Sequence, residues 1–166
     1  MGNYYPPNIA GAEEFLATAW PAIRQRVPGA RFVICGKLCD AFQGRAFPGV
    51  ELAGVVPSLD VYYQRAAVVV NLVPYGSGLK IKTVEALAHG KATVVTPAGA
   101  EGLPDPPSRG LRVCGMPEMA DAVAALLEDP AARAAEEDAA WAYACARLTP
   151  TAVYGELTAL LKEHCA

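Results

Sequence analysis

A lysine, a glutamate and a histidine follow a glycine-bearing turn near the middle of this chain. The turn is Gly76-Ser77-Gly78, and it leads into a segment with helical periodicity. A turn of this kind leaves backbone N–H groups free to bind an anion such as phosphate. Lys82, Glu85 and His89 are spaced three and four residues apart, which places them on one side of a helix. We therefore expect a phosphate at the turn and a hydroxyl-bearing group further along.

The distance between the turn and Glu85 suits a nucleotide. Glu85 lies seven residues beyond Gly78, or about 10 Å along a helix axis, and helical side chains lean back towards the N-terminus. A diphosphate could bind the turn while both ribose hydroxyls donate to the Glu85 carboxylate. Lys82 or Lys80 would balance the phosphate charge. The alternative is an ordinary surface pair between Lys82 and Glu85, worth a few tenths of a kcal/mol, and spacing alone slightly favours it.

The elements around this segment alternate between strands and helices. We expect the helix after the turn to run from Leu79 to Ala88, capped by Ser77, with Ile81, Val84, Leu87 and Ala88 on its apolar side. The expected strands are Ala30 to Cys35, Val50 to Ala53, Ala67 to Leu72, Ala92 to Thr96 and Leu111 to Cys114. The other expected helices begin at Asn8 (bent near Pro21), Ser58, Met116, Pro130 and Thr151.

This order predicts a Rossmann-like, three-layer α/β/α fold with a mostly parallel sheet. Residues 67–72 are β-prone and apolar, so we expect a central strand buried on both faces. Ligands of such sheets bind beyond the carboxyl ends of the strands, where the loops at Gly36, Gly54, residues 74–78 and residues 97–102 would meet. The last helix, with apolar residues at helical spacing from Val153 to Leu161, would be core or interface.

Composition narrows the class of protein. The 166 residues fit one domain, residues 1–166, and the formal net charge of −3 argues against a nucleic-acid partner. No apolar run approaches ~18 residues and no signal core opens the chain, so a cytoplasmic protein, soluble or peripheral to a membrane, is expected. Five scattered cysteines (Cys35, Cys39, Cys114, Cys145 and Cys165) fit buried free thiols, and we expect no metal and no cofactor.

The central segment resembles the donor-binding signature of retaining glycosyltransferases of the GT-B fold, family 4 or group 1. The matching positions are Gly76, Ser77, Gly78, Lys82, Glu85, Ala86, Gly90, Val94, Val95, Thr96, Gly99, Ala100, Glu101, Gly102 and Leu103. Further similarity covers the YPPN segment at residues 5–8, residues 20–36 and the helical tail.

The resemblance implies the nucleotide-sugar-binding half of a two-domain, hexosyltransferase-like enzyme whose N-terminal acceptor half is missing here. Glu85 matches the glutamate that holds the donor ribose, and Gly78 matches the glycine whose amides meet the diphosphate. Ser77 stands where the family usually has another glutamate, and Lys80 where it usually has a glycine. Lys82 is the residue implied to act catalytically, with Lys37 a weaker candidate for the diphosphate; no protein nucleophile is implied.

The donor contacts implied in this way come from Gly36, Gly76, Ser77, Gly78, Leu79, Lys82, Glu85, Glu101 and Gly102. The fragment would bind a nucleotide-diphosphate sugar without turning over alone, and any membrane association would come through the missing half. His89 fits a surface residue at a helix end, and Tyr62 and Tyr63 fit packing residues.

The alternative is a non-catalytic nucleotide-binding or regulatory α/β module. A dinucleotide oxidoreductase is disfavoured, because no GxGxxG follows a first strand. The base, the sugar and the acceptor are not specified by the sequence.

Overall fold

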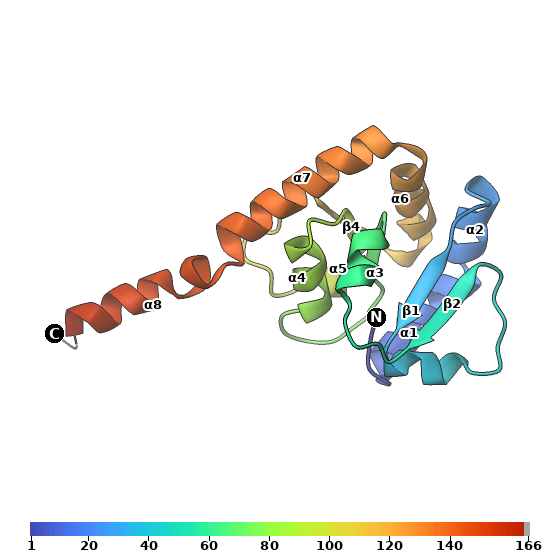
Figure 1. Cartoon of the computed structure of the whole chain (residues 1–166), viewed down its shortest axis with the longest axis horizontal. Helices are drawn as coiled ribbons and strands as arrows, with labels where there is room; N and C mark the ends of the chain where they lie inside the picture. Colours follow the sequence, from blue (N-terminus) through green and yellow to red (C-terminus); the bar gives the residue numbers. More distant parts are fainter. Residues whose placement is uncertain (165–166) are drawn as a thin grey trace.

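The computed structural model describes residues 1–164 as an α/β domain with five short parallel strands (Figure 1). Strand β1 (Phe32–Cys35) pairs with β2 (Val50–Gly54), and β4 (Thr93–Val95) lies between β3 (Val69–Asn71) and β5 (Leu111–Val113). All the pairings are parallel, as predicted. Within residues 1–164 no ladder joins β1 to β3, so the strands form two separate pieces where one sheet was expected.

The helices alternate with the strands as predicted, except that two short ones lie in segments expected to be loops. They are α1 (Pro6–Ala17), α2 (Ala19–Arg26), η1 (Lys37–Phe42, a 3₁₀ helix), α3 (Asp60–Arg65), α4 (Ile81–Ala88), α5 (Pro97–Ala100), α6 (Met116–Glu128), α7 (Pro130–Arg147) and α8 (Pro150–His164). The unexpected ones are η1 and α5. Nowhere in the described chain is a helix long and apolar enough to span a membrane.

The first helix starts earlier than predicted. It begins at Pro6, because a proline suits the first helical turn, where its missing N–H is not needed. Asn8 is therefore inside the helix, and the prediction that it caps the helix is wrong; its side-chain amide donates to the Asn3 carbonyl oxygen at 3.0 Å. The expected break occurs at Thr18, three residues before Pro21.

Two groups of buried side chains lie on opposite sides of β4. The larger group joins α1, α2 and α6 to the first face and includes the fully buried Phe15 and Val94. The smaller group joins α4 and α7 to the other face and includes Leu87 and Val95. Successive strand residues point to opposite faces, so Val94 and Val95 belong to different groups. The prediction of a buried strand here is confirmed.

Burial of β3 differs from the prediction. Val69 and Val70 are only half-buried, although both faces of this strand were expected to be covered. The strand pairs with β4 along one edge, and its other edge faces a cavity. The incomplete burial of β3 therefore follows from the cavity along this edge.

The last helix and the cysteines correct two further predictions. Helix α8 extends away from the rest of the domain, and within residues 150–164 no side chain is buried, so a core role is wrong; an interface role stays a prediction (Figure 1). Cys35 and Cys39 are free and buried as expected, but Cys114 is half-buried and Cys145 is exposed. The prediction for Cys165 lies outside the described residues.

Candidate ligand site at the turn before α4

The glycine turn is exposed and does not lead directly into the helix. Gly76 and Gly78 have φ angles of 135° and 76°, in the region that favours glycine. Helix α4 begins at Ile81, with Lys80 as the flanking residue and no capping side chain. The prediction that Ser77 caps a helix from Leu79 is therefore wrong, because the two positive φ angles carry the chain through an extra bend first.

Lys80 fixes the shape of this turn. Its ammonium donates to the carbonyl oxygens of Gly78 at 2.7 Å and Gly76 at 3.2 Å, and it lies 3.4 Å from the Glu101 carboxylate. Only 11% of the Lys80 side chain is exposed. Since the carbonyls turn towards the lysine, and no backbone N–H of residues 76–80 donates to any other group within residues 1–164, those N–H groups are available to an anion.

The segment after β4 packs directly on the turn. Thr96 caps α5 by accepting from the Gly99 N–H at 3.1 Å and donates to the Val73 carbonyl at 2.5 Å. Gly102 has a φ angle of 83°, and a Cβ there would lie 2.7 Å from the Leu79 Cα. Leu79, Glu101 and Gly102 therefore come together as predicted, although a short helix stands where only a loop was expected.

A buried threonine sets which side of α4 faces the domain. The Thr83 hydroxyl accepts from the Asn71 amide at 2.9 Å and donates to the Gly99 carbonyl at 2.7 Å. Thr83, Ala86 and Leu87 form the buried face. Ile81 is 68% exposed, which overturns its predicted packing role. It lies two residues before Thr83, about 200° around the helix, and so points away from the sheet.

Lys82 is a half-buried residue of α4 that faces α1. Its ammonium donates to the Asn8 side-chain oxygen at 2.5 Å, and burial lowers the pKa of Lys82 to about 8. The Met1 amine lies close enough that Lys82 contributes to lowering its pKa, after burial itself. Among the ion pairs of residues 1–164 there is none between Lys82 and Glu85, so the alternative of a surface pair is wrong.

Glu85 contacts Tyr63, for which the sequence predicted only a packing role. The Tyr63 hydroxyl donates to the Glu85 carboxylate at 3.4 Å, and the Tyr63 ring stacks on His89 with centroids 4.4 Å apart. Burial, followed by the nearby Glu85 charge, raises the pKa of Tyr63, so the phenol stays a donor. Packing of Tyr63 is confirmed. The contact between Tyr63 and Glu85 had no signal in the spacing, because 22 residues separate them.

Gly36 has a structural reason to be glycine. Its φ angle is 91°, a Cβ would lie 2.4 Å from the Gly2 carbonyl oxygen, and its own N–H donates to the Gly54 carbonyl at 2.6 Å. The N–H is thus already used within the domain. Gly36 follows the last residue of β1 and lies against Gly2, at the edge of the strands where the site was expected.

The structure thus gathers the predicted residues into two neighbouring groups along α4. The first is the turn with Leu79, Glu101 and Gly102, held by Lys80. The second is Lys82 with Asn8 and Glu85 with Tyr63. Gly36 belongs to neither group, because it contacts Gly2 and Gly54. In the part of the chain that the structure describes, no three metal-ligating side chains lie together.

Comparison with known proteins places the chain in a family. A model of the family described as "Glycosyl transferases group 1" matches residues 1–129. The chain belongs to this family. Its fold resembles the C-terminal domain of a group 1 family glycosyl transferase (LpcC) from Francisella tularensis, with a TM-score of 0.71 and 17% identity, over 90% of this chain and 84% of that one. No curated protein matches this group 1 chain. Family membership indicates glycosyl transfer as the chemistry that the domain serves.

Proposed function

We propose that this chain is the donor-binding half of a retaining glycosyltransferase of the GT-B type, family 4, that uses a nucleotide-diphosphate sugar. The observation that carries the proposal is Lys82, a half-buried ammonium in the first turn of α4 with an uncharged partner, Asn8. Within residues 1–164 no carboxylate forms an ion pair with this ammonium, and the turn just before it has available N–H groups. A diphosphate would supply the missing charge.

Each part of the site then has a task. The amides of residues 76–80 and Lys82 receive the diphosphate, and Glu85 accepts from the ribose hydroxyls. Breaking the anomeric C–O bond builds negative charge on the leaving diphosphate, so donors fixed in advance by Lys80 and Asn8 lower the barrier electrostatically. Ser77 and Glu101 are exposed at the mouth of the turn and are placed here as contacts to the sugar or the diphosphate. The Ser77 hydroxyl is not assigned as a nucleophile.

Residues 1–166 act in this proposal as one domain, and the acceptor is bound by a second domain outside this sequence. The isolated chain binds nucleotide without transferring sugar. No metal is required, because Lys82 and the turn amides supply the positive field.

Isothermal titration tests the proposal directly. UDP, GDP and their sugars are titrated into the chain, into a Glu85→Ala variant and into a Glu156→Ala variant, since Glu156 is exposed on α8 and matches the charge change. We expect binding that weakens at least about tenfold in Glu85→Ala, in line with the loss of hydrogen bonds to a charged group, and not in Glu156→Ala. Absence of binding by the parent chain refutes the donor-domain proposal, and equal binding by all three refutes the role of Glu85.

A second function is supported by one residue. Ser77 occupies the position at which the family resemblance expects a glutamate, so a nucleotide-binding module without catalysis would keep the turn and Glu85. Activity of the full-length protein separates the two functions: loss on Lys82→Ala supports catalysis, and a full-length protein that binds donor but transfers no sugar supports the module.

A further inference from the structure

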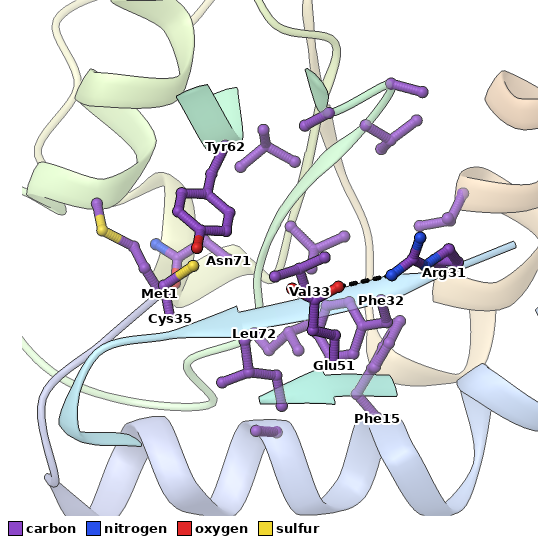
Figure 2. A pocket seen from close by; sticks show the side chains of 18 of the residues that line it. Met1, Phe15, Arg31, Phe32, Val33, Cys35, Glu51, Tyr62, Asn71 and Leu72 are labelled. Carbon is purple, nitrogen blue, oxygen red and sulfur yellow. Dashed lines mark hydrogen bonds and ion pairs between the residues drawn. The ribbon is translucent and has the colours of Figure 1, made fainter. Parts of the chain in front are cut away.

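A cavity of about 540 Å³ separates the two pieces of the sheet. Residues 29–35 line one side and residues 65–73 the other, and Phe15 of α1 and Val123 of α6, both from the larger buried group, also line the cavity. In Figure 2 the cavity runs along β1, with Met1 and Cys35 at one end and Arg31 at the other. Arg31 pairs with Glu51 at 2.7 Å, so those charges satisfy each other at the rim.

The cavity has the backbone edge of a strand on each side. In β1, the Phe32 and Gly36 N–H groups donate towards β2, to the Gly49 and Gly54 carbonyls. Alternate residues of a strand turn their N–H and C=O groups to opposite edges, so Val33 and Cys35 present theirs to the cavity.

The same reasoning applies to β3. The Val69 N–H donates to Ala92 and the Asn71 carbonyl accepts from the Thr96 N–H, both on the β4 side. Val68 and Val70 therefore turn their backbone groups towards the cavity. Two parallel strands with facing open edges are the surroundings of a central strand, not of a compact small molecule.

The start of the chain already pairs with the open edge at the end of β1. The Gly2 N–H donates to the Cys35 carbonyl at 2.9 Å, and the Gly2 carbonyl accepts from the Leu38 N–H at 2.9 Å. The Met1 amine is buried at this end of the cavity, and burial lowers its pKa. Chain attached to that amine would start inside the cavity, beside Cys35.

The side chains around the cavity also lack a neighbour. The two strands that border the cavity carry four apolar residues that are only half-buried: Phe32, Val33, Val69 and Val70. The Asn71 side-chain oxygen is buried, and in the described chain it has no hydrogen-bond partner. An added strand would cover the four apolar residues and bring backbone N–H groups close to Asn71.

We propose that this cavity, the strand slot between β1 and β3, binds one extended apolar segment that is joined to the Met1 amine. The segment runs parallel to β1 and β3 and ends at Gly2, because the Gly2 pairing lies at the carboxyl end of β1. At about 3.3 Å per residue, the seven residues from 29 to 35 extend over roughly 23 Å, which suits a segment of about six residues ahead of Met1. The two pieces then become one six-stranded sheet, with the added strand between β1 and β3.

The experiment extends the chain at Met1 with six apolar, β-branched or aromatic residues. Two controls carry a six-residue Gly/Ser extension, which also converts the Met1 amine to an amide, and the apolar extension with proline at its third and fifth residues. Thermal unfolding, hydrogen exchange and sedimentation are measured on all four proteins.

We expect the apolar extension alone to raise the unfolding midpoint by at least about 5 °C, since even a modest gain in stability shifts a domain of this size by several degrees. We also expect exchange of the Val33 and Val70 amides to slow at least tenfold while the protein stays monomeric. Equal midpoints for the apolar and Gly/Ser extensions, or unchanged exchange at both valines, would overturn the proposal. Dimers formed only by the extended chain would overturn it too, because the occupant would then come from a second copy.

Discussion

Binding of a diphosphate should draw a proton onto Lys82. Burial holds the pKa of this lysine at about 8, against 10.5 in water. A diphosphate beside the ammonium stabilises the charged form, so the pKa should return to its ordinary value or above. The Met1 amine is buried nearby with a lowered pKa, and Glu85 lies on the same helix, so both must be separated from the effect of Lys82.

The size of the effect follows from the two pKa values. With a free pKa of about 8 and a bound pKa of 10.5 or more, uptake is about 0.1 proton at pH 7, about 0.5 at pH 8 and about 0.9 at pH 9. The charged fraction of the free protein falls about tenfold between pH 7 and pH 9. The affinity for the diphosphate should fall by the same factor, or about 1.4 kcal/mol.

The assay is isothermal titration of UDP at pH 8 in two buffers of unlike ionisation enthalpy. The difference in observed heat gives the number of protons taken up. A Lys82→Met variant keeps the buried hydrocarbon and loses the charge, while the Met1 amine remains, so subtraction isolates the lysine. Equal uptake by the chain and by Lys82→Met refutes the reasoning, as does binding without uptake at pH 9.

The same lysine makes stability depend on pH. The unfolded chain binds more protons than the folded one between pH 8 and pH 10.5, so the free energy of unfolding should rise with pH across this window. The difference between this pKa of about 8 and the ordinary 10.5 corresponds to roughly 3 kcal/mol at most, because partial exposure to solvent reduces the effect. Urea unfolding of the chain and of Lys82→Met checks the slope, which the variant should lack.

Two further predictions concern the residues that shape the site. Tyr63→Phe removes the donor to Glu85 and should weaken UDP binding by about three- to tenfold in titrations, with little change in the unfolding midpoint; an unchanged affinity would contradict a positioning role. Gly102→Ala should lower the free energy of unfolding by at least about 2 kcal/mol in urea, because strain at positive φ adds to the clash with Leu79. The matched Gly44→Ala change, at a φ angle of 75° with open space around it, should cost only about 1 kcal/mol, and equal losses would show that the clash is relieved.

The sequence predicted the elements better than their environments. Strand β4 and helices α6 and α7 agree with the expected positions because their periodicity and flanking prolines are local signals. The start of α4 was wrong because Lys80 binds two turn carbonyls, a contact that spacing does not encode. The half-burial of β3 could not be predicted from apolar residues alone, since burial depends on which strand lies alongside.

In the candidate site, too, local spacing predicted some features and tertiary contacts decided the others. The shared side of Lys82 and Glu85 follows from helical geometry. Their partners do not: Asn8 lies 74 residues from Lys82, and Tyr63 lies 22 residues from Glu85 on another helix, α3. The absence of an ion pair between Lys82 and Glu85 also depends on these partners, because each side chain is drawn to a different neighbour.

Strand β4 has a consequence for how motion spreads through this domain. Val94 contacts one buried group and Val95 the other, and the strand between them has only three residues. The buried group under α4 and α7 and the buried group under α1, α2 and α6 therefore both depend on the same short strand. Local unfolding that displaces β4 from one group also displaces it from the other. We therefore expect the slowest-exchanging amides of both groups to become exposed together, as one cooperative unit.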